Sequence, residues 1–138
     1  VGTFWGITFY DDAISTTPES TMYAIDAFER VGTIFLGGQD RGYDFSALVK
    51  KLEERQIQHV VLFPDSGEKI RSLIASSVSY APTILRTKSM EEAVKFAYEH
   101  TPDGYVCLLS CASPSYSIWK NFEEKGNEFA KYVHLFGA

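Results

Sequence analysis

Residues 33–52 read TIFLGGQDRGYDFSALVKKL, and this stretch predicts the fold. It opens with a short apolar run rich in β-formers, and two glycines follow the run directly. Apolar residues then recur at the i, i+3, i+4, i+7 spacing of an amphipathic helix. This helical pattern is carried by Phe45, Leu48, Val49 and Leu52. A buried strand that turns into a helix after a short loop is the repeating unit of α/β proteins.

The same alternation extends in both directions along the chain. The predicted strands are Thr8–Tyr10, Thr33–Leu36, His59–Phe63, Thr83–Leu85 and Tyr105–Leu109. Helical stripes with short connectors separate them, and the last stripe is formed by Ile118, Phe122, Phe129 and Val133. Continuous apolar strands are typical of a parallel sheet that is covered on both faces. We therefore expect a Rossmann-like, three-layer α/β domain with a mostly parallel sheet of about six strands and helices on both faces.

Polar residues predict where the helices begin. Thr17 is a suitable cap and Pro18 suits a first helical position, while Asp44 and Ser89 stand before the second and fourth helices. Ser113 or Ser115 is expected to start the last helix, which would place Phe122 two turns inside it as a core residue.

Composition excludes several classes of protein. The chain has 138 residues, a net charge of −5 and no basic stripe, so nucleic acid is not an expected partner. No apolar run approaches the roughly 20 residues of a membrane-spanning helix. The Cys107 and Cys111 pair is a poor zinc signal, and we expect no metal site and a reduced, cytoplasmic protein. Because the chain lacks a starting Met, we expect a piece of a longer protein whose residues 1–138 form one domain.

Ligands of parallel α/β sheets bind beyond the carboxyl ends of the strands. This rule nominates four segments: YDDAISTTPES (residues 10–20), LGGQDRGYDF (36–45), FPDSGEK (63–69) and SCASPSYS (110–117). No G-x-G-x-x-G dinucleotide fingerprint and no G-x-x-x-x-G-K-[ST] phosphate loop occurs in the chain. A nucleotide would therefore have to be bound by residues outside these two motifs.

Each of these segments allows a functional and a structural interpretation. Asp11 and Asp12 precede a helix start, where they either favour a Mg²⁺-bound phosphate or an amine, or form a capped turn. Arg41 can grip a carboxylate through two hydrogen bonds, or can be an exposed, solvated side chain. Ser113 or Ser115 can cap a helix, bind an anion or act as a nucleophile, and the absence of G-x-S-x-G disfavours the last role.

Three of the segments together resemble the C-terminal domain of the Mur ligases that add D-glutamate in peptidoglycan synthesis. LGGQDRGYDF is similar to their LGG-x-D-[KR]-G-x-DF stretch, and FYDDAISTTPEST to their N-D-S-x-[SA]-T-[NT] segment. SCASPSYSIWKNFEEKGNEF is similar to their serine-rich loop and the helix after it. The motifs occur in the family's order over essentially the whole chain.

The resemblance implies a reaction in two steps. ATP phosphorylates the carboxylate of UDP-N-acetylmuramoyl-L-alanine, and the amine of D-glutamate then attacks the acyl phosphate. ATP and Mg²⁺ are bound mainly by a central domain absent from this chain, which the C-terminal domain contacts on closing. We accordingly expect a monomer whose isolated C-terminal fragment has no ligase activity.

The resemblance also implies residue roles. Thr16, Arg41, Ser115 and Phe122 would contact D-glutamate, with Ser113 as the alternative serine, and Asp12 would reach the ATP side. Ile14 departs from the family, since many members have a lysine there. Two alternatives stay open: a related Mur-type or polyglutamate ligase domain with a different amino-acid substrate, and a stand-alone α/β binding module.

Overall fold

The computed structural model describes residues 1–115 and 118–138, and it shows a six-stranded sheet with five α-helices in the described chain. The strands are β1 (Gly2–Phe4), β2 (Ile7–Asp11), β3 (Val31–Gly37), β4 (His59–Phe63), β5 (Thr83–Arg86) and β6 (Val106–Leu109). The helices are α1 (Pro18–Asp26), α2 (Ser46–Glu54), α3 (Ser66–Ala75), α4 (Met90–His100) and α5 (Phe122–Gly137).

The strand order is β1-β2-β6-β3-β4-β5, and every neighbouring pair except β1 and β2 is parallel. The predicted α/β class and mostly parallel sheet are therefore confirmed. Strand β6 lies between β2 and β3, so the chain after α4 returns to the middle of the sheet. The loops that follow β2, β6 and β3 are consequently neighbours at one edge.

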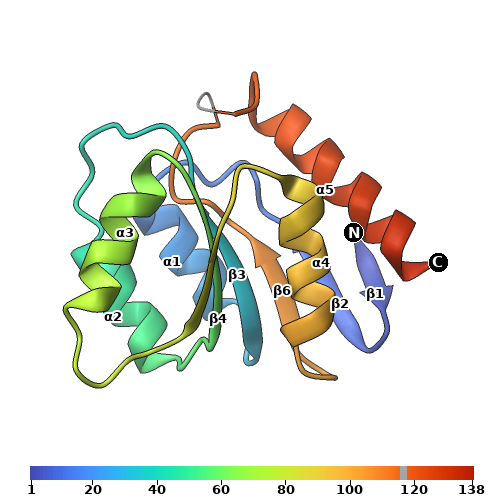
Figure 1. Ribbon diagram of the computed structural model, residues 1–138, viewed down its shortest axis with the longest axis horizontal. Helices are drawn as coiled ribbons and strands as arrows, with labels where there is room; N and C mark the ends of the chain where they lie inside the picture. The colour runs from blue at the N-terminus through green and yellow to red at the C-terminus, as the bar shows by residue number, and fades with distance from the viewer. Residues whose placement is uncertain (116–117) are drawn as a thin grey trace.

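Helices cover both faces of the sheet, as the continuous apolar strands predict. Figure 1 shows α1, α2 and α3 on one side of the sheet and α4 and α5 on the other. Each face has its own apolar core: Ile34 and Leu36 of β3 belong to the core under α1–α3, whereas Phe35 belongs to the core under α4 and α5. The side chains of β3 alternate between the two cores because successive residues of a strand point to opposite faces.

The last helix begins later than its apolar stripe predicts. Helix α5 starts at Phe122, and its N-cap is Asn121, whose Oδ1 accepts a hydrogen bond from the Glu124 N–H at 2.8 Å. The expectations that Ser113 or Ser115 starts this helix and that Phe122 lies two turns inside it are therefore wrong. Asparagine is among the best N-cap residues, and it decides the start over the apolar spacing.

The other helix starts follow the capping signals more closely. Thr17 caps α1 with Pro18 in the first position, and Ser89 caps α4 by accepting from the Glu92 N–H. The predicted cap at Asp44 is displaced by one residue: Phe45 is the N-cap of α2, while Asp44 accepts from the Ser46 N–H at 2.9 Å. None of the described helices is long and apolar enough to cross a membrane.

Candidate functional site

Three of the nominated segments meet where β2, β6 and β3 end. We name them the aspartate segment (residues 11–17), the serine-rich loop (residues 110–117, described to 115) and the glycine loop (residues 37–45). The Gly37 N–H donates to the Cys111 carbonyl and the Gln39 N–H to the Pro114 carbonyl, both at 2.8 Å. In Figure 1 the connections after β3 and β6 lie along the upper edge of the molecule. The serine-rich loop is thus held directly against the glycine loop.

Asp12 joins the aspartate segment to the serine-rich loop. Its Oδ2 accepts hydrogen bonds from the Ser15 hydroxyl at 2.5 Å and from the Ser110 hydroxyl at 2.8 Å. The Asp12 N–H donates to the Leu109 carbonyl at 2.8 Å. These bonds fix the direction of the carboxylate. Sequence reasoning treated Ser110 only as one member of a serine run, because its partner is 98 residues away in the chain.

Thr16 lies at the start of α1 with a hydroxyl available for a ligand. The neighbouring Thr17 performs the capping, since its Oγ1 accepts from the Ser20 N–H at 3.2 Å. Thr16 is half-buried, and among the described residues its hydroxyl makes no hydrogen bond. A helix N-terminus also favours an anion because its first N–H groups lack helical partners.

Two glycines allow the glycine loop to approach its neighbours. Gly38 has a φ of +157°, and a Cβ at this position would lie 2.2 Å from the Pro114 carbonyl oxygen. Gly37 has a φ of +106°, and a Cβ there would lie 2.0 Å from the Phe63 carbonyl oxygen. Any larger residue would push the serine-rich loop or β4 away. The double glycine of the sequence is therefore required by close packing.

Ser113 and Ser115 have different environments, although both are buried. The Ser113 hydroxyl is 2.7 Å from the Ser66 hydroxyl, and Ser66 also accepts from the Gly38 N–H at 3.0 Å. This buried relay connects the serine-rich loop, the glycine loop and the start of α3. Ser115 is 2% exposed, and its hydroxyl has no hydrogen-bond partner among the described residues. Since buried hydroxyls are normally satisfied, Ser115 has unused capacity for a ligand.

Arg41 is exposed in the glycine loop. Its Nε donates to the Gln39 Oε1 at 3.1 Å, and it forms no salt bridge with any described residue. The neighbouring Asp40 is instead paired with Lys69 at 3.4 Å. The two terminal nitrogens of the Arg41 guanidinium therefore remain available for a carboxylate.

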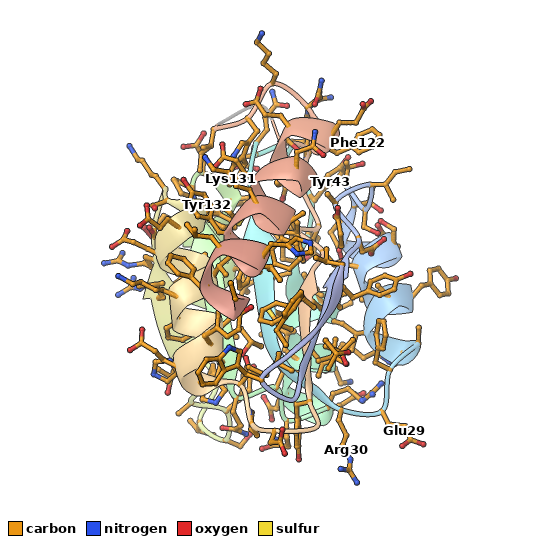
Figure 2. All side chains as sticks on the ribbon, turned by 90° about the vertical axis from the view of Figure 1, so that its right-hand side faces the viewer. Glu29, Arg30, Tyr43, Phe122, Lys131 and Tyr132 are labelled. Carbon is orange, nitrogen blue, oxygen red and sulfur yellow. The ribbon has the colours of Figure 1, made fainter. Side chains whose placement is uncertain are left out.

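A cleft of about 300 Å³ opens between the end of β2 and the first turns of α5. Phe122 and Ile14 form its apolar rim, with side chains 38% and 67% exposed, and Asp11 lies inside it. Figure 2 shows Phe122 at the upper end of α5, whereas Glu29 and Arg30 lie at the opposite end of the molecule. The delayed start of α5 thus moves Phe122 out of the core and to the edge where the strands end.

One residue near this edge escaped the sequence reasoning. Lys125, in the first turn of α5, is 0% exposed and its Nζ has no hydrogen-bond partner among the described residues. Burial raises the pKa of the Cys111 thiol, and the neighbouring Lys125 acts in the opposite direction. Lys125 stands three residues after Phe122 and four before Phe129, which places it on the apolar stripe of the helix. A charged residue at such a position is the sequence signal that could have predicted a buried lysine.

Comparison with known proteins places this arrangement in a family. The model of the "Mur ligase, glutamate ligase domain" family matches residues 1–112. The chain belongs to this Mur ligase family. The resemblance on which the predicted roles depend is therefore confirmed at the level of the family, whereas the roles of individual residues stay predictions.

Some relatives of this Mur ligase domain are named as L-glutamate ligases and others as D-glutamate ligases. The chain is 41% identical over 93% of its length to a UDP-N-acetylmuramoyl-L-alanine:L-glutamate ligase of Salinispora tropica. It is 34% identical over 93% of its length to a UDP-N-acetylmuramoylalanine:D-glutamate ligase of Caldanaerobacter subterraneus. The chain spans 28% of the length of both relatives.

Solved structures agree on the fold. A ligase domain from Haemophilus ducreyi matches with a TM-score of 0.64 and 16% identity, over 97% of this chain and 94% of that one. A MurF ligase of Thermotoga maritima in complex with ADP matches with a TM-score of 0.57 and 16% identity, over 96% of this chain and 30% of that one. The fold of the chain thus occurs both in a separately crystallised domain and as part of a larger ligase.

Proposed function

We propose that residues 1–138 are the C-terminal, glutamate-binding domain of an ATP-dependent ligase that adds glutamate to UDP-N-acetylmuramoyl-L-alanine in peptidoglycan synthesis. The enzyme acts in the cytoplasm as a monomer. The observation that carries the proposal is the family match together with relatives that are named as glutamate ligases of this substrate. The N-terminal and central domains of the enzyme, which bind most of the ATP, would lie outside this chain.

The arrangement of unused polar groups supports binding of a dicarboxylate. Glutamate has two carboxylates and one ammonium group. Arg41 offers a bidentate partner to one carboxylate. The Ser115 hydroxyl, with Phe122 on the rim of the neighbouring cleft, suits the other carboxylate. Thr16 adds a hydroxyl at the N-terminus of α1, where a negative charge is favoured.

Ser115 is a better candidate than Ser113 for the serine that contacts glutamate. The Ser113 hydroxyl already has a partner in Ser66, so recruiting it would break a buried hydrogen bond. Within the described part of the chain, the Ser115 hydroxyl has no such bond to lose. A substrate carboxylate would satisfy it and remove the cost of leaving it unpaired.

Asp12 is the residue of this domain that would face ATP when the domains close. Its carboxylate is held by Ser15 and Ser110, which presents a fixed negative group at the strand edge. Among the described residues no three His, Cys, Asp or Glu side chains are grouped as a metal site. Mg²⁺ and ATP would accordingly be held mainly by the central domain, and this chain would contribute orientation and charge. Product release then requires the domains to open again.

A second candidate substrate is L-glutamate, and a specific observation favours it. The two relatives with 41% identity are both named L-glutamate ligases, whereas the D-glutamate ligases compared are 32–36% identical. Ile14 also replaces the lysine common among D-glutamate enzymes of the family, and it lines the candidate cleft. Purified full-length enzyme assayed with each enantiomer in turn would decide: the preferred substrate is the one with the higher kcat/KM.

Replacing Arg41 tests the site itself. In the full-length enzyme, Arg41→Ala should raise the KM for the preferred glutamate enantiomer by about tenfold or more, because a charge-assisted hydrogen bond contributes roughly 1.5–3 kcal/mol. The KM for ATP should change little. Arg71→Ala is the matched control, since Arg71 is an exposed arginine of α3 without an ion pair among the described residues. An unchanged KM for glutamate in Arg41→Ala would contradict the assignment.

A further inference from the structure

The buried ammonium of Lys125 is the least explained group in the structure. Lysine is almost never fully buried without a partner, because removing its charge from water is costly. Lys125 is 0% exposed, and its Nζ has no hydrogen-bond partner among the described residues. Ionisable groups in such low-polarity surroundings cluster at functional sites.

Asp11 and Asp12, which like Lys125 act on the Cys111 thiol, are already engaged by other groups. Asp12 accepts from Ser15 and Ser110, and the Asp11 Oδ1 accepts from the Ala13 N–H at 2.9 Å. Neither aspartate forms a salt bridge with Lys125 within the described parts of the chain. The positive charge of Lys125 is therefore not neutralised by a bonded carboxylate.

The position of Lys125 places this charge beneath the candidate glutamate site. It interacts with the thiol of Cys111 in the serine-rich loop. Its helical neighbours Phe122 and Gly126 line the cleft, and a Cβ on Gly126 would lie 2.5 Å from the Asp11 carboxylate. The ammonium is therefore close to Cys111 of the serine-rich loop, on a helix whose first turns line the cleft.

We propose that Lys125 is a positioning residue whose buried charge makes the serine-rich loop attractive to a carboxylate of the glutamate substrate. This inference rests on the proposed function and adds a residue to it. The charge acts through the low-polarity interior under the loop, where electrostatic interactions are stronger than in water.

Lys125→Met in the full-length enzyme is the decisive variant, because methionine preserves most of the buried apolar stem and removes the charge. We expect a KM for glutamate that rises about tenfold or more, with a melting temperature equal to or above that of the wild type. Lys125→Arg should restore most of the glutamate KM. Lys131→Met is the matched control: Lys131 is exposed farther along α5 (Figure 2), so the same loss of charge should leave the glutamate KM unchanged.

Each alternative result would overturn the inference. A lower melting temperature with an unchanged glutamate KM would make Lys125 a purely structural residue. A raised KM for ATP or for UDP-N-acetylmuramoyl-L-alanine with an unchanged glutamate KM would assign the charge to a phosphate or to the other substrate. A wild-type enzyme without glutamate-ligase activity would refute the proposed function itself, which separates the two failures.

Discussion

The relay of Ser66, Ser113 and the Gly38 N–H leads to a quantitative prediction about two serines that look equivalent in the sequence. In Ser66→Ala the Gly38 N–H and the Ser113 hydroxyl both lose their buried partner. An unsatisfied buried donor costs about 1–3 kcal/mol and a lost neutral hydrogen bond about 1 kcal/mol, so the expected loss is about 2–4 kcal/mol. Ser113→Ala loses only the bond to Ser66 and should cost about 1 kcal/mol.

Ser115→Ala provides the contrast within the same loop. Its hydroxyl has no hydrogen-bond partner in residues 1–115 and 118–138, so its removal should change the free energy of unfolding by less than about 0.5 kcal/mol. In the full-length enzyme the same variant should raise the KM for glutamate, whereas Ser113→Ala should leave that KM nearly unchanged. Stability and substrate binding are thus expected to depend on different serines.

Urea denaturation of residues 1–138, followed by circular dichroism, measures these differences. The chain has a complete apolar core on each face of its sheet, which supports its use alone. The double variant Ser66→Ala with Ser113→Ala should cost less than the two single changes together by about 1 kcal/mol, because the shared bond is counted twice. Additive losses, or a Ser115→Ala loss as large as that of Ser113→Ala, would refute the relay.

Two further predictions concern the glycine loop and a half-buried histidine. Gly38→Ala should lower the free energy of unfolding by more than about 2 kcal/mol and weaken glutamate binding. Gly42→Ala, with a φ of +77° but no atom within 4 Å of the new Cβ, should lower it by only about 1–2 kcal/mol. Urea denaturation measures both losses, and equal losses would contradict the close packing at Gly38. Burial and the charge of His100 lower the pKa of His59, so its contribution to stability is complete above about pH 6.5 and is lost as the pH falls below that value. His59→Gln should therefore make the melting temperature fall less steeply between about pH 7.5 and pH 5.5. His134→Gln is the control, because His134 is exposed. An unchanged dependence of melting temperature on pH in His59→Gln would count against this explanation.

The order of strands and helices was predictable because periodicity is a local signal. Every strand from β2 to β6 overlaps a predicted apolar run, and His59–Phe63 agrees at both ends. Thr17 and Ser89 were predictable as caps for the same reason, since a cap interacts within about one helical turn. The family resemblance added candidate residues because its motifs follow strand ends, where ligands of such sheets bind.

Two local signals, an apolar stripe and a capping residue, predict different starts for α5, and the spacing of apolar residues alone does not decide between them. An apolar stripe from Ile118 predicted an early start, whereas the Asn121 side chain caps the helix three residues later. Trp119 then becomes buried against Phe63, with ring centroids 5.1 Å apart, and Phe122 becomes exposed. Side-chain packing from another strand thereby selects between two local patterns of similar strength.

The amino-acid pattern was enough to predict the α/β class and the parallel sheet, which the structure confirms, because each depends on residues close in the chain. The edge at which a ligand would bind stays a prediction. Tertiary structure alone decided which of the two serines has a hydroxyl without a partner in the described chain, since the partner of Ser113 is Ser66, 47 residues away. It also decided that Lys125 is buried with no hydrogen-bond partner for its Nζ among the described residues. Hydrogen-bond satisfaction and burial depend on neighbours that only the folded chain brings together, and these two properties distinguish the proposed binding groups from the supporting ones.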